Sequence, residues 1–240
     1  MNPTFQLGKI GGIRIAVNWS WLVILGLITW TLESSVFPDQ DPHLSKSTYV
    51  VMGFVAALLF IASLLLHELG HALVARREGI EIDGITLWLF GGVTRFKGTF
   101  RSPGSEFRIA VAGPLVSLAL GGLSVGVALL VREPVSVQGV AAWLGYSNLL
   151  LFVFNMLPAA PLDGGRLLHA LVWRTKHDFG RATRIATGSG RVLGYLLIAG
   201  GVALLFTRDT SGGIWLAFVG WFLAQAATAE SRQPPPLRPA

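Results

Sequence analysis

Long apolar runs are the feature that most constrains this sequence, because several are long enough to cross the hydrocarbon core of a lipid bilayer. Lipid offers the backbone no hydrogen-bond partners, so such runs can cross it only as helices. Apolar residues make up 52% of the 240 residues and charged residues only 13%, about half the charged share of soluble domains. The composition therefore excludes a soluble globular protein and a disordered chain.

The apolar runs predict six membrane-spanning helices. The last two runs are shorter than the others, and Gly200-Gly201 interrupts the fifth, so five spans is the alternative. The predicted spans cover residues 15–32, 49–75, 109–131, 139–157, 192–206 and 214–227.

The Lys and Arg residues predict how these helices are oriented, because cytosolic loops of membrane proteins are enriched in them. With both termini in the cytosol, 16 of the 19 basic residues fall on the cytosolic side, and only Lys46, Arg132 and Arg208 fall outside. The opposite topology would invert this bias. We therefore expect an integral multi-pass protein of the cell membrane with cytosolic N- and C-termini, which contacts the lipid bilayer and no nucleic acid.

Two segments outside the spans alternate between apolar and polar residues, as strands do. Residues 5–7 and 13–17 indicate a short strand on the cytosolic face, and residues 80–101 resemble a β-hairpin with its turn at Gly91-Gly92. Open strands cannot face lipid, so this segment should lie at the interface or be covered by helices. The expected fold class is a membrane all-α protein with about six transmembrane helices and a small interfacial β-hairpin or sheet on the cytosolic side.

Titratable residues lie inside the second predicted span, where charge is costly and therefore indicates function. Arg76 marks the cytosolic interface, and His67 precedes it by nine residues, which is roughly 14 Å along a helix. His67 and His71 share one helix face and can bind one metal ion, while Glu68 can contact a metal-bound water as a general base. A polar patch that only holds helices together is the alternative, and three titratable groups would be a costly way to make one.

A third metal ligand should come from elsewhere in the chain, because two histidines leave a metal ion underligated. The sequence has no cysteine. His43 falls in an outer loop, His177 in a basic loop, and His169 on an apolar helical stretch. Asp163 follows the fourth span after two prolines, and irregular backbone at that depth must be buried or line a cavity. The alternative role of Asp163 is to cap a helix over residues 167–173.

These motifs resemble those of the site-2 protease family of intramembrane zinc metalloproteases. Two paired motifs on separate spans are a highly specific signal, and the likeness extends over about residues 10–230. The resemblance is carried by His67-Glu68-Leu69-Gly70-His71 and by Asn155, Pro158 and Pro161-Leu162-Asp163-Gly164-Gly165-Arg166, with support from Gly113-Pro114-Leu115 and Gly91-Gly92-Val93.

The resemblance implies hydrolysis of peptide bonds within or near transmembrane segments of membrane proteins. His67, His71 and Asp163 would then bind one zinc ion per chain. Glu68 would be the catalytic base, and Asn155 would lie near the substrate carbonyl and stabilise the oxyanion. Zinc suits two histidines and one aspartate with an open position, although affinity order alone does not exclude other divalent ions.

The resemblance also implies how substrates bind and which branch of the family is involved. A strand of Gly91, Gly92, Val93 and Thr94 would offer its edge to an unwound substrate segment, such as one from a single-pass regulator of the anti-sigma type. The 84 residues from His71 to Asn155 leave no room for a PDZ domain, which fits a compact branch that often carries CBS domains.

The expected domain organisation follows from this branch. Residues 1–230 would form the transmembrane metalloprotease core, and residues 231–240 a proline-rich tail or linker. A regulatory, nucleotide-sensing domain would attach at this end and is missing from this chain.

Two other functions are compatible with the sequence. A non-proteolytic metal-binding transporter or scaffold in the membrane would also bind the metal, but it would not need Glu68. A zinc protease that trims soluble or prenylated peptides at the cytosolic face would use the same residues. The identity of the substrate distinguishes this protease from one that cleaves transmembrane segments.

Overall fold

The structure is a computed structural model that describes residues 5–88, 91–98, 100–131, 133–206 and 210–232. Within these ranges, six helices are long and apolar enough to cross a membrane, and the strands form one four-stranded sheet. This is the architecture of a multi-pass membrane protein, and it confirms the predicted fold class. The expectation of a proline-rich tail falls on residues 233–240, which lie outside the described residues.

The chain divides into two compact units. The first comprises Met1–Gly98 and Ala112–Val153, and the second comprises Thr99–Val111 and Phe154–Ala240. Two helices contribute to both units. Helix α4, Pro103–Leu130, begins in the second unit and continues in the first, whereas α5, Val135–Asn155, ends in the second.

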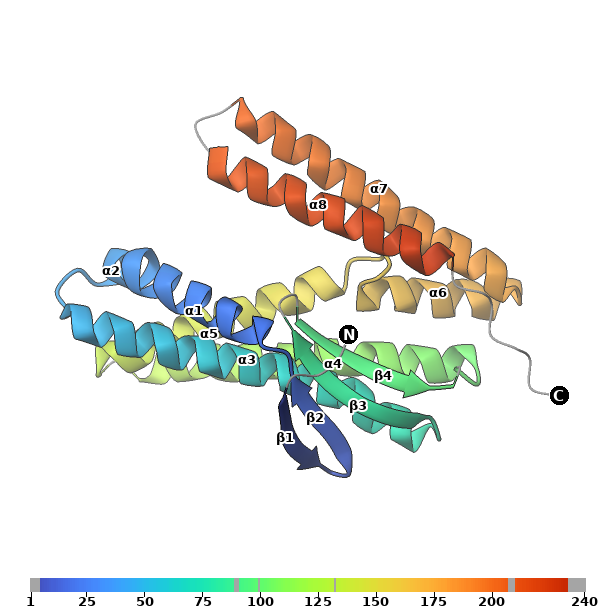
Figure 1. Ribbon diagram of the computed structural model, residues 1–240, viewed down its shortest axis with the longest axis horizontal. Helices are drawn as coiled ribbons and strands as arrows, with labels where there is room; N and C mark the ends of the chain where they lie inside the picture. Colours follow the sequence, from blue (N-terminus) through green and yellow to red (C-terminus); the bar gives the residue numbers. More distant parts are fainter. Residues whose placement is uncertain (1–4, 89–90, 99, 132, 207–209, 233–240) are drawn as a thin grey trace. The chain divides into compact units, whose positions relative to one another are not determined.

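Helix α3, Lys46–Arg77, is the central element of the first unit (Figure 1). It begins after Ser45, whose side chain accepts a hydrogen bond from the backbone N–H of Thr48 at 3.2 Å, as an N-cap residue does. It ends with Arg76 and Arg77, whose charges favour a helix C-terminus. The unit's other N-terminal helices are α1 (Ser20–Thr31), a π-helical turn (Leu32–Val36) and α2 (Phe37–Gln40).

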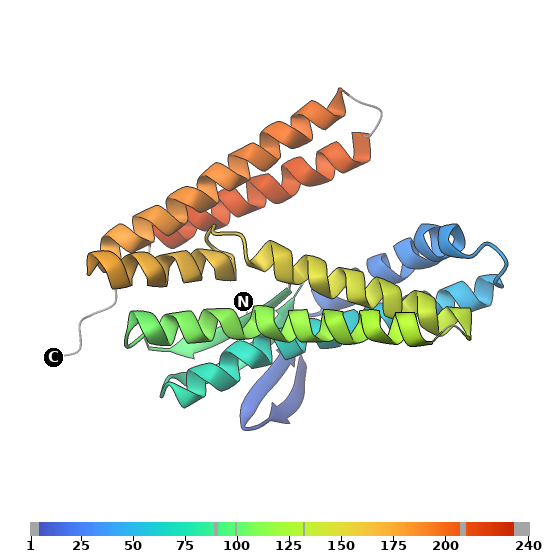
Figure 2. The same cartoon turned by 180° about the vertical axis from the view of Figure 1, so that it is seen from behind.

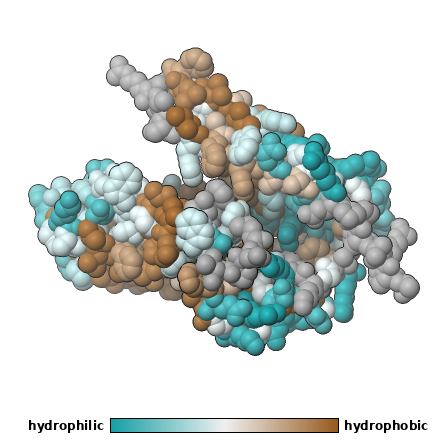
Figure 3. Space-filling model, in the orientation of Figure 1, coloured by the Kyte–Doolittle hydropathy of each residue, from teal (hydrophilic) through white to brown (hydrophobic). Residues whose placement is uncertain are grey.

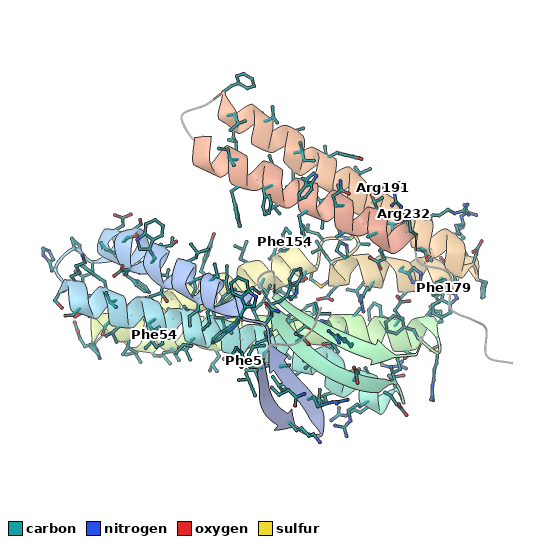
Figure 4. All side chains as sticks on the ribbon, viewed as in Figure 1. Phe5, Phe54, Phe154, Phe179, Arg191 and Arg232 are labelled. Carbon is teal, nitrogen blue, oxygen red and sulfur yellow. The ribbon has the colours of Figure 1, made fainter. Side chains whose placement is uncertain are left out.

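The outer faces of these helices carry large apolar side chains. Phe54 on α3, which Figure 4 labels, is exposed, and so is Trp30 on α1. Apolar surface is visible over the helical part of this unit in Figure 3. Water would make such surfaces sites of aggregation, whereas lipid tails solvate them. The exposed apolar faces therefore agree with helices that contact lipid.

The sheet packs on the C-terminal half of α3. Its strands are β1 (Phe5–Ile10), β2 (Ile13–Val17), β3 (Glu81–Trp88) and β4 (Gly91–Lys97), in the order β1-β2-β3-β4. The β2–β3 pair is parallel and the other two pairs are antiparallel. Ile13, Ile15 and Ile85 from the sheet form a buried cluster with Leu69 and Ala72 of α3. This cluster fixes the sheet beside the helical turn that carries His71.

The predicted start of the first span is wrong. Residue 15 lies in β2, where Ile13, Ile15 and Val17 are buried, and α1 begins only at Ser20. The backbone N–H of Ser20 donates to Asn18 Oδ1 at 3.0 Å. The alternation of residues 13–17 therefore indicates their structure correctly, and their apolar composition does not make them part of the span.

The predicted position of the hairpin turn is also wrong. Gly91 and Gly92 lie in β4, opposite Trp88 and Leu87 of β3, so the glycine pair forms part of the strand. Glycine at position 92 has a packing role, because a Cβ there would lie 2.9 Å from Glu68 Cδ. Gly92 therefore marks a close approach of strand and helix rather than a turn.

The second unit is built on α6 (Asp163–Lys176), α7 (Phe179–Leu205) and α8 (Thr210–Ser231). Helices α7 and α8 lie side by side in both ribbon views (Figures 1 and 2). Gly194 and Gly201 of α7 meet Gly220 and Gly213 of α8, so the two backbones approach closely, as small residues allow in membrane helices. The fifth span is longer than predicted, since α7 begins at Phe179 and runs unbroken through Gly200-Gly201.

Adjacent glycines of α7 provide a test of this interface. A Cβ at Gly201 would lie 2.5 Å from the backbone nitrogen of Ala217, whereas one at Gly200 would make an ordinary 3.6 Å contact with Leu216 Cδ2. Gly201→Ala should lower the free energy of unfolding by about 1–3 kcal/mol through overpacking. Gly200→Ala, the matched control, should keep or raise stability because alanine favours helices. Thermal unfolding in detergent measures both, and equal midpoints for the two variants would contradict this packing.

Candidate metal centre

The two histidines of the second span face one another inside the first unit. His67 and His71 lie one turn apart on α3 and are 5% and 7% exposed. Their Nε2 atoms are 3.2 Å apart, and the rings meet edge to face. Two nitrogens that bind one tetrahedral zinc ion at about 2.0–2.1 Å are separated by about 3.3 Å. The spacing of the pair therefore fits a shared metal ion.

Gly113 of α4 leaves the space that such an ion needs. A Cβ at this position would overlap His71 Nε2 and would lie 2.7 Å from His67 Nε2. Any larger residue would therefore fill the space beside both nitrogens. Gly70 of α3 contributes to the same close packing, since its Cβ would lie 3.0 Å from the carbonyl oxygen of Ala112.

Glu68 is held by the sheet rather than by its own helix. Thr94 Oγ1 of β4 donates a hydrogen bond to Glu68 Oε2 at 2.7 Å, and the backbone at Gly92 packs against the side chain of Glu68. The carboxylate is partly buried, and it lies on the same helical turn as the two histidines. The structure thus brings His67, Glu68 and His71 together with two residues of the predicted substrate strand, Gly92 and Thr94.

Asp163 is the first residue of α6 in the second unit. The N-cap position is occupied by Leu162, without a side-chain capping bond. The loop before the helix folds back over its first turn, and a Cβ at Gly164 would lie 2.5 Å from the carbonyl oxygen of Met156. A side chain at either of the two glycines that follow Asp163 would collide with this loop. The fold-back therefore fixes the position of Asp163 at the start of α6.

The same loop is anchored on α7. The backbone N–H of Ala160 donates to the carbonyl of Ala186 at 3.1 Å, and Ser189 Oγ donates to the carbonyl of Pro158 at 2.6 Å. Gly190 lies directly against the carbonyl of Ala160. Asn155, the last residue of α5, precedes this anchored loop.

The three remaining histidines have other surroundings. His169 is buried, with Nδ1 2.8 Å from Glu106 Oε2, Nε2 3.2 Å from Thr183 Oγ1, and its ring edge to face against Phe179 at the start of α7 (Figure 4). Both of its nitrogens are thus engaged within the second unit. His43 lies in the exposed loop before α3, and His177 ends α6 in a left-handed conformation.

One contact of the site is not foreseen by the sequence. Ser117 of α4 is fully buried, and its Oγ lies 2.9 Å from His67 Nδ1. The signal for it is weak: Ser117 stands one turn after Gly113, and therefore on the same helix face. A single serine in an apolar helix more often bonds to its own backbone.

This chain is similar to known proteins. Residues 55–137 and 132–197 match peptidase family M50. Rip3 of Mycobacterium tuberculosis is 47% identical over 234 residues, which cover 96% of this chain and 59% of that protein. Protein sll0528 of Synechocystis is 39% identical over 233 residues, which cover 97% of this chain and 61% of that protein. Both names contain the words zinc metalloprotease, and this chain spans about three fifths of their length.

A solved structure is similar over almost the whole chain. The site-2 protease from Methanocaldococcus jannaschii matches with a TM-score of 0.63 and 29% sequence identity, covering 96% of each chain. The family match extends over more than half of the sequence and includes the histidine pair and the Asp163 segment. The chain therefore belongs to peptidase family M50, the site-2 protease family.

Proposed function

We propose that this chain is an intramembrane zinc metalloprotease that hydrolyses peptide bonds within or near transmembrane segments of membrane proteins. The observation that carries the proposal is the Glu68 carboxylate, held by Thr94 on the helical turn of the histidine pair. Transport or scaffolding would need only metal ligands, whereas hydrolysis also needs a positioned base. The names of the M50 relatives Rip3 and sll0528 support zinc as the metal.

His67, His71 and Asp163 are proposed to hold one zinc ion per chain. They offer two imidazole nitrogens and a carboxylate oxygen, a donor set that could hold a metal ion. Three protein ligands leave one position of a tetrahedral site open for chemistry. When bound, zinc supplies a Lewis acid for the attacking water and the peptide carbonyl.

Glu68 is proposed to move the proton. Its carboxylate takes a proton from the attacking water while the oxygen of that water bonds to the peptide carbon. The C–N bond then breaks, and Glu68 returns the proton to the leaving nitrogen. Thr94 occupies Oε2 of the carboxylate, which restricts its rotation and directs Oε1 to the reacting water. Asn155 is proposed to donate to the carbonyl oxygen as negative charge develops on it.

The strand of Gly91, Gly92, Val93 and Thr94 is proposed to bind the substrate. Among the described residues, β4 pairs only with β3, so its outer edge can accept another strand. A transmembrane helix must unwind before its peptide bonds become reachable. Pairing with β4 would satisfy the backbone groups exposed by unwinding and present them beside Glu68.

The bias of basic residues supports an orientation with cytosolic termini in the cell membrane. The sheet and the cytosolic end of α3 then lie on the side from which water enters. A membrane-protein substrate, such as a single-pass regulator of the anti-sigma type, is proposed as the partner. This topology also favours cleavage nearer to the cytosolic face of the bilayer.

Glu68→Gln tests the proposed base. Glutamine keeps the size of the side chain but cannot take the proton, so cleavage of a single-pass test substrate should fall by about 100-fold or more. Bound zinc, measured by elemental analysis, should stay at the wild-type level. Glu81→Gln, at an exposed position in β3, is the matched control and should retain activity. Cleavage retained in the Glu68 variant would instead favour the transporter or scaffold.

Asp163→Ala tests the proposed third ligand. Loss of one of three protein ligands should lower the zinc content of purified protein well below one per chain. The control is Asp178→Ala, which removes a carboxylate that caps α7 by accepting from the backbone N–H of Arg181 at 2.9 Å. Unchanged zinc in the Asp163 variant would leave this residue with a role at the helix start only.

Gly113→Ala tests the space beside the histidine pair. The added methyl group would occupy the position next to both Nε2 atoms, so zinc binding should be lost even though all three ligands are intact. Gly122→Ala on the same helix is the control, since a Cβ there meets no atom within 4 Å. Full zinc occupancy in the Gly113 variant would show that the ion binds elsewhere.

A further inference from the structure

A buried pair of titratable residues lies in the second unit and takes no part in the proposed chemistry. His169 of α6 and Glu106 of α4 are 7% and 4% exposed, and His169 Nδ1 lies 2.8 Å from Glu106 Oε2. Replacing a buried pair of this kind by apolar side chains of similar volume often leaves stability unchanged or raises it. The pair therefore indicates a role other than stability alone.

The contact joins three helices in a fixed geometry. His169 Nε2 lies 3.2 Å from Thr183 Oγ1 of α7, and the Thr183 hydroxyl donates to the carbonyl of Phe179 at 3.0 Å. The imidazole ring also meets the ring of Phe179, which Figure 4 labels, with centroids 4.6 Å apart. Glu106 lies in the first turn of α4, where the helix dipole favours a carboxylate. His169 is therefore held on α4 and on α7 at once, through different atoms of one ring.

The chain is attached to α7 on both sides of Asp163. Before Asp163, the backbone N–H of Ala160 donates to the carbonyl of Ala186 at 3.1 Å. After it, His169 contacts Thr183, which lies three residues before Ala186 and therefore on the same side of α7. Asp163 precedes His169 by six residues, which is about 9 Å along a helix. The position of the first residue of α6 thus depends on where His169 is held.

Glu106 attaches α6 to the helix that borders the histidine pair. Helix α4 is unbroken from Pro103 to Leu130, and Gly113 follows Glu106 by seven residues, which places both on one helix face. Gly113 is the residue whose Cβ would lie 2.7 Å from His67 Nε2. One face of α4 therefore carries the attachment of α6 and, two turns later, the space beside the two histidines.

We propose that Glu106 and His169 are positioning residues for Asp163, the proposed third zinc ligand. Their contact fixes α6 on α4, so the carboxylate at the start of α6 has little freedom relative to the face of α4 that carries Gly113. A ligand that is held in place before the metal arrives loses less conformational freedom on binding, which strengthens binding. This inference rests on the proposed zinc site and deepens it.

The zinc affinity of the chain in detergent, measured by competition with a chromogenic chelator, tests the proposal. Glu106→Ala removes the partner of His169 and should weaken zinc binding by about 10-fold. His169→Phe keeps an aromatic ring against Phe179 and removes both nitrogens. It should cause a similar loss, and it measures the same contact if the alanine variant does not fold. Wild-type affinity in either folded variant would overturn the proposal.

A conservative variant tests whether the hydrogen bond is what holds α6. Glu106→Gln keeps a side-chain oxygen that can accept from His169 Nδ1, so it should bind zinc nearly as the wild type does. A loss as large as that in Glu106→Ala would show that this hydrogen bond does not position the ligand, and it would overturn the proposal.

Gly201→Ala separates positioning from a general loss of stability. Its added methyl group overpacks the interface of α7 with α8, so it should lower the unfolding midpoint while zinc affinity stays at the wild-type level. The midpoint of each metal-free variant is measured beside its affinity. A loss of affinity in Gly201→Ala equal to that in Glu106→Ala would mean that lower stability alone weakens binding, and it would overturn the proposal.

A double-mutant cycle tests whether Glu106 acts through Asp163. If it does, Glu106→Ala weakens zinc binding in the wild type but adds little in the Asp163→Ala background. Equal losses in the two backgrounds would overturn the positioning role.

The outcome also distinguishes this inference from the proposed function. A wild-type chain that binds no zinc would overturn both. A wild-type chain that binds zinc and cleaves substrate, with Glu106 and His169 variants of equal zinc affinity, would overturn only the roles of these two residues.

Discussion

Two nitrogen lone pairs cannot face each other at 3.2 Å in a dry environment unless a proton or a cation lies between them. The Nε2 atoms of His67 and His71 are in this situation in the C-terminal half of α3, and the surrounding structure is arranged about them. Gly113 leaves the space beside them, Ser117 contacts the far nitrogen of one ring, and the sheet packs on the next face of the same turn. The turn of α3 that carries the histidine pair is thus contacted both by α4 and by the sheet.

The sequence predicts the parts of this site that depend on one element alone. His67, Glu68 and His71 are recognised because a helix repeats every 3.6 residues and because charge is costly within an apolar run. The six spans are predicted because apolar runs that are long enough to cross a bilayer must form helices there. The start of α7 at Phe179 is missed because its first turns carry arginines, which lower the mean hydropathy although the helix is unbroken.

Contacts between distant elements could not be predicted. The parallel pairing of β2 with β3 joins segments about 70 residues apart, and nothing local specifies it. Ser117 approaches His67 across 50 residues of sequence. The pair Gly91-Gly92 predicts a turn because glycine is most often found there, although Gly92 lies in a strand. In each case the deciding fact is which backbone lies opposite, and this depends on how α3, α4 and the sheet pack together.

The contact between Gly92 and Glu68 makes the alignment of β4 unusually strict. Sliding this strand by one position would put Val93 where only a hydrogen atom fits, and it would separate the Thr94 hydroxyl from the carboxylate. Movement of β4 along its own axis is therefore resisted by the side chain of Glu68. The alignment of the strand and the position of the Glu68 carboxylate therefore cannot change independently of each other.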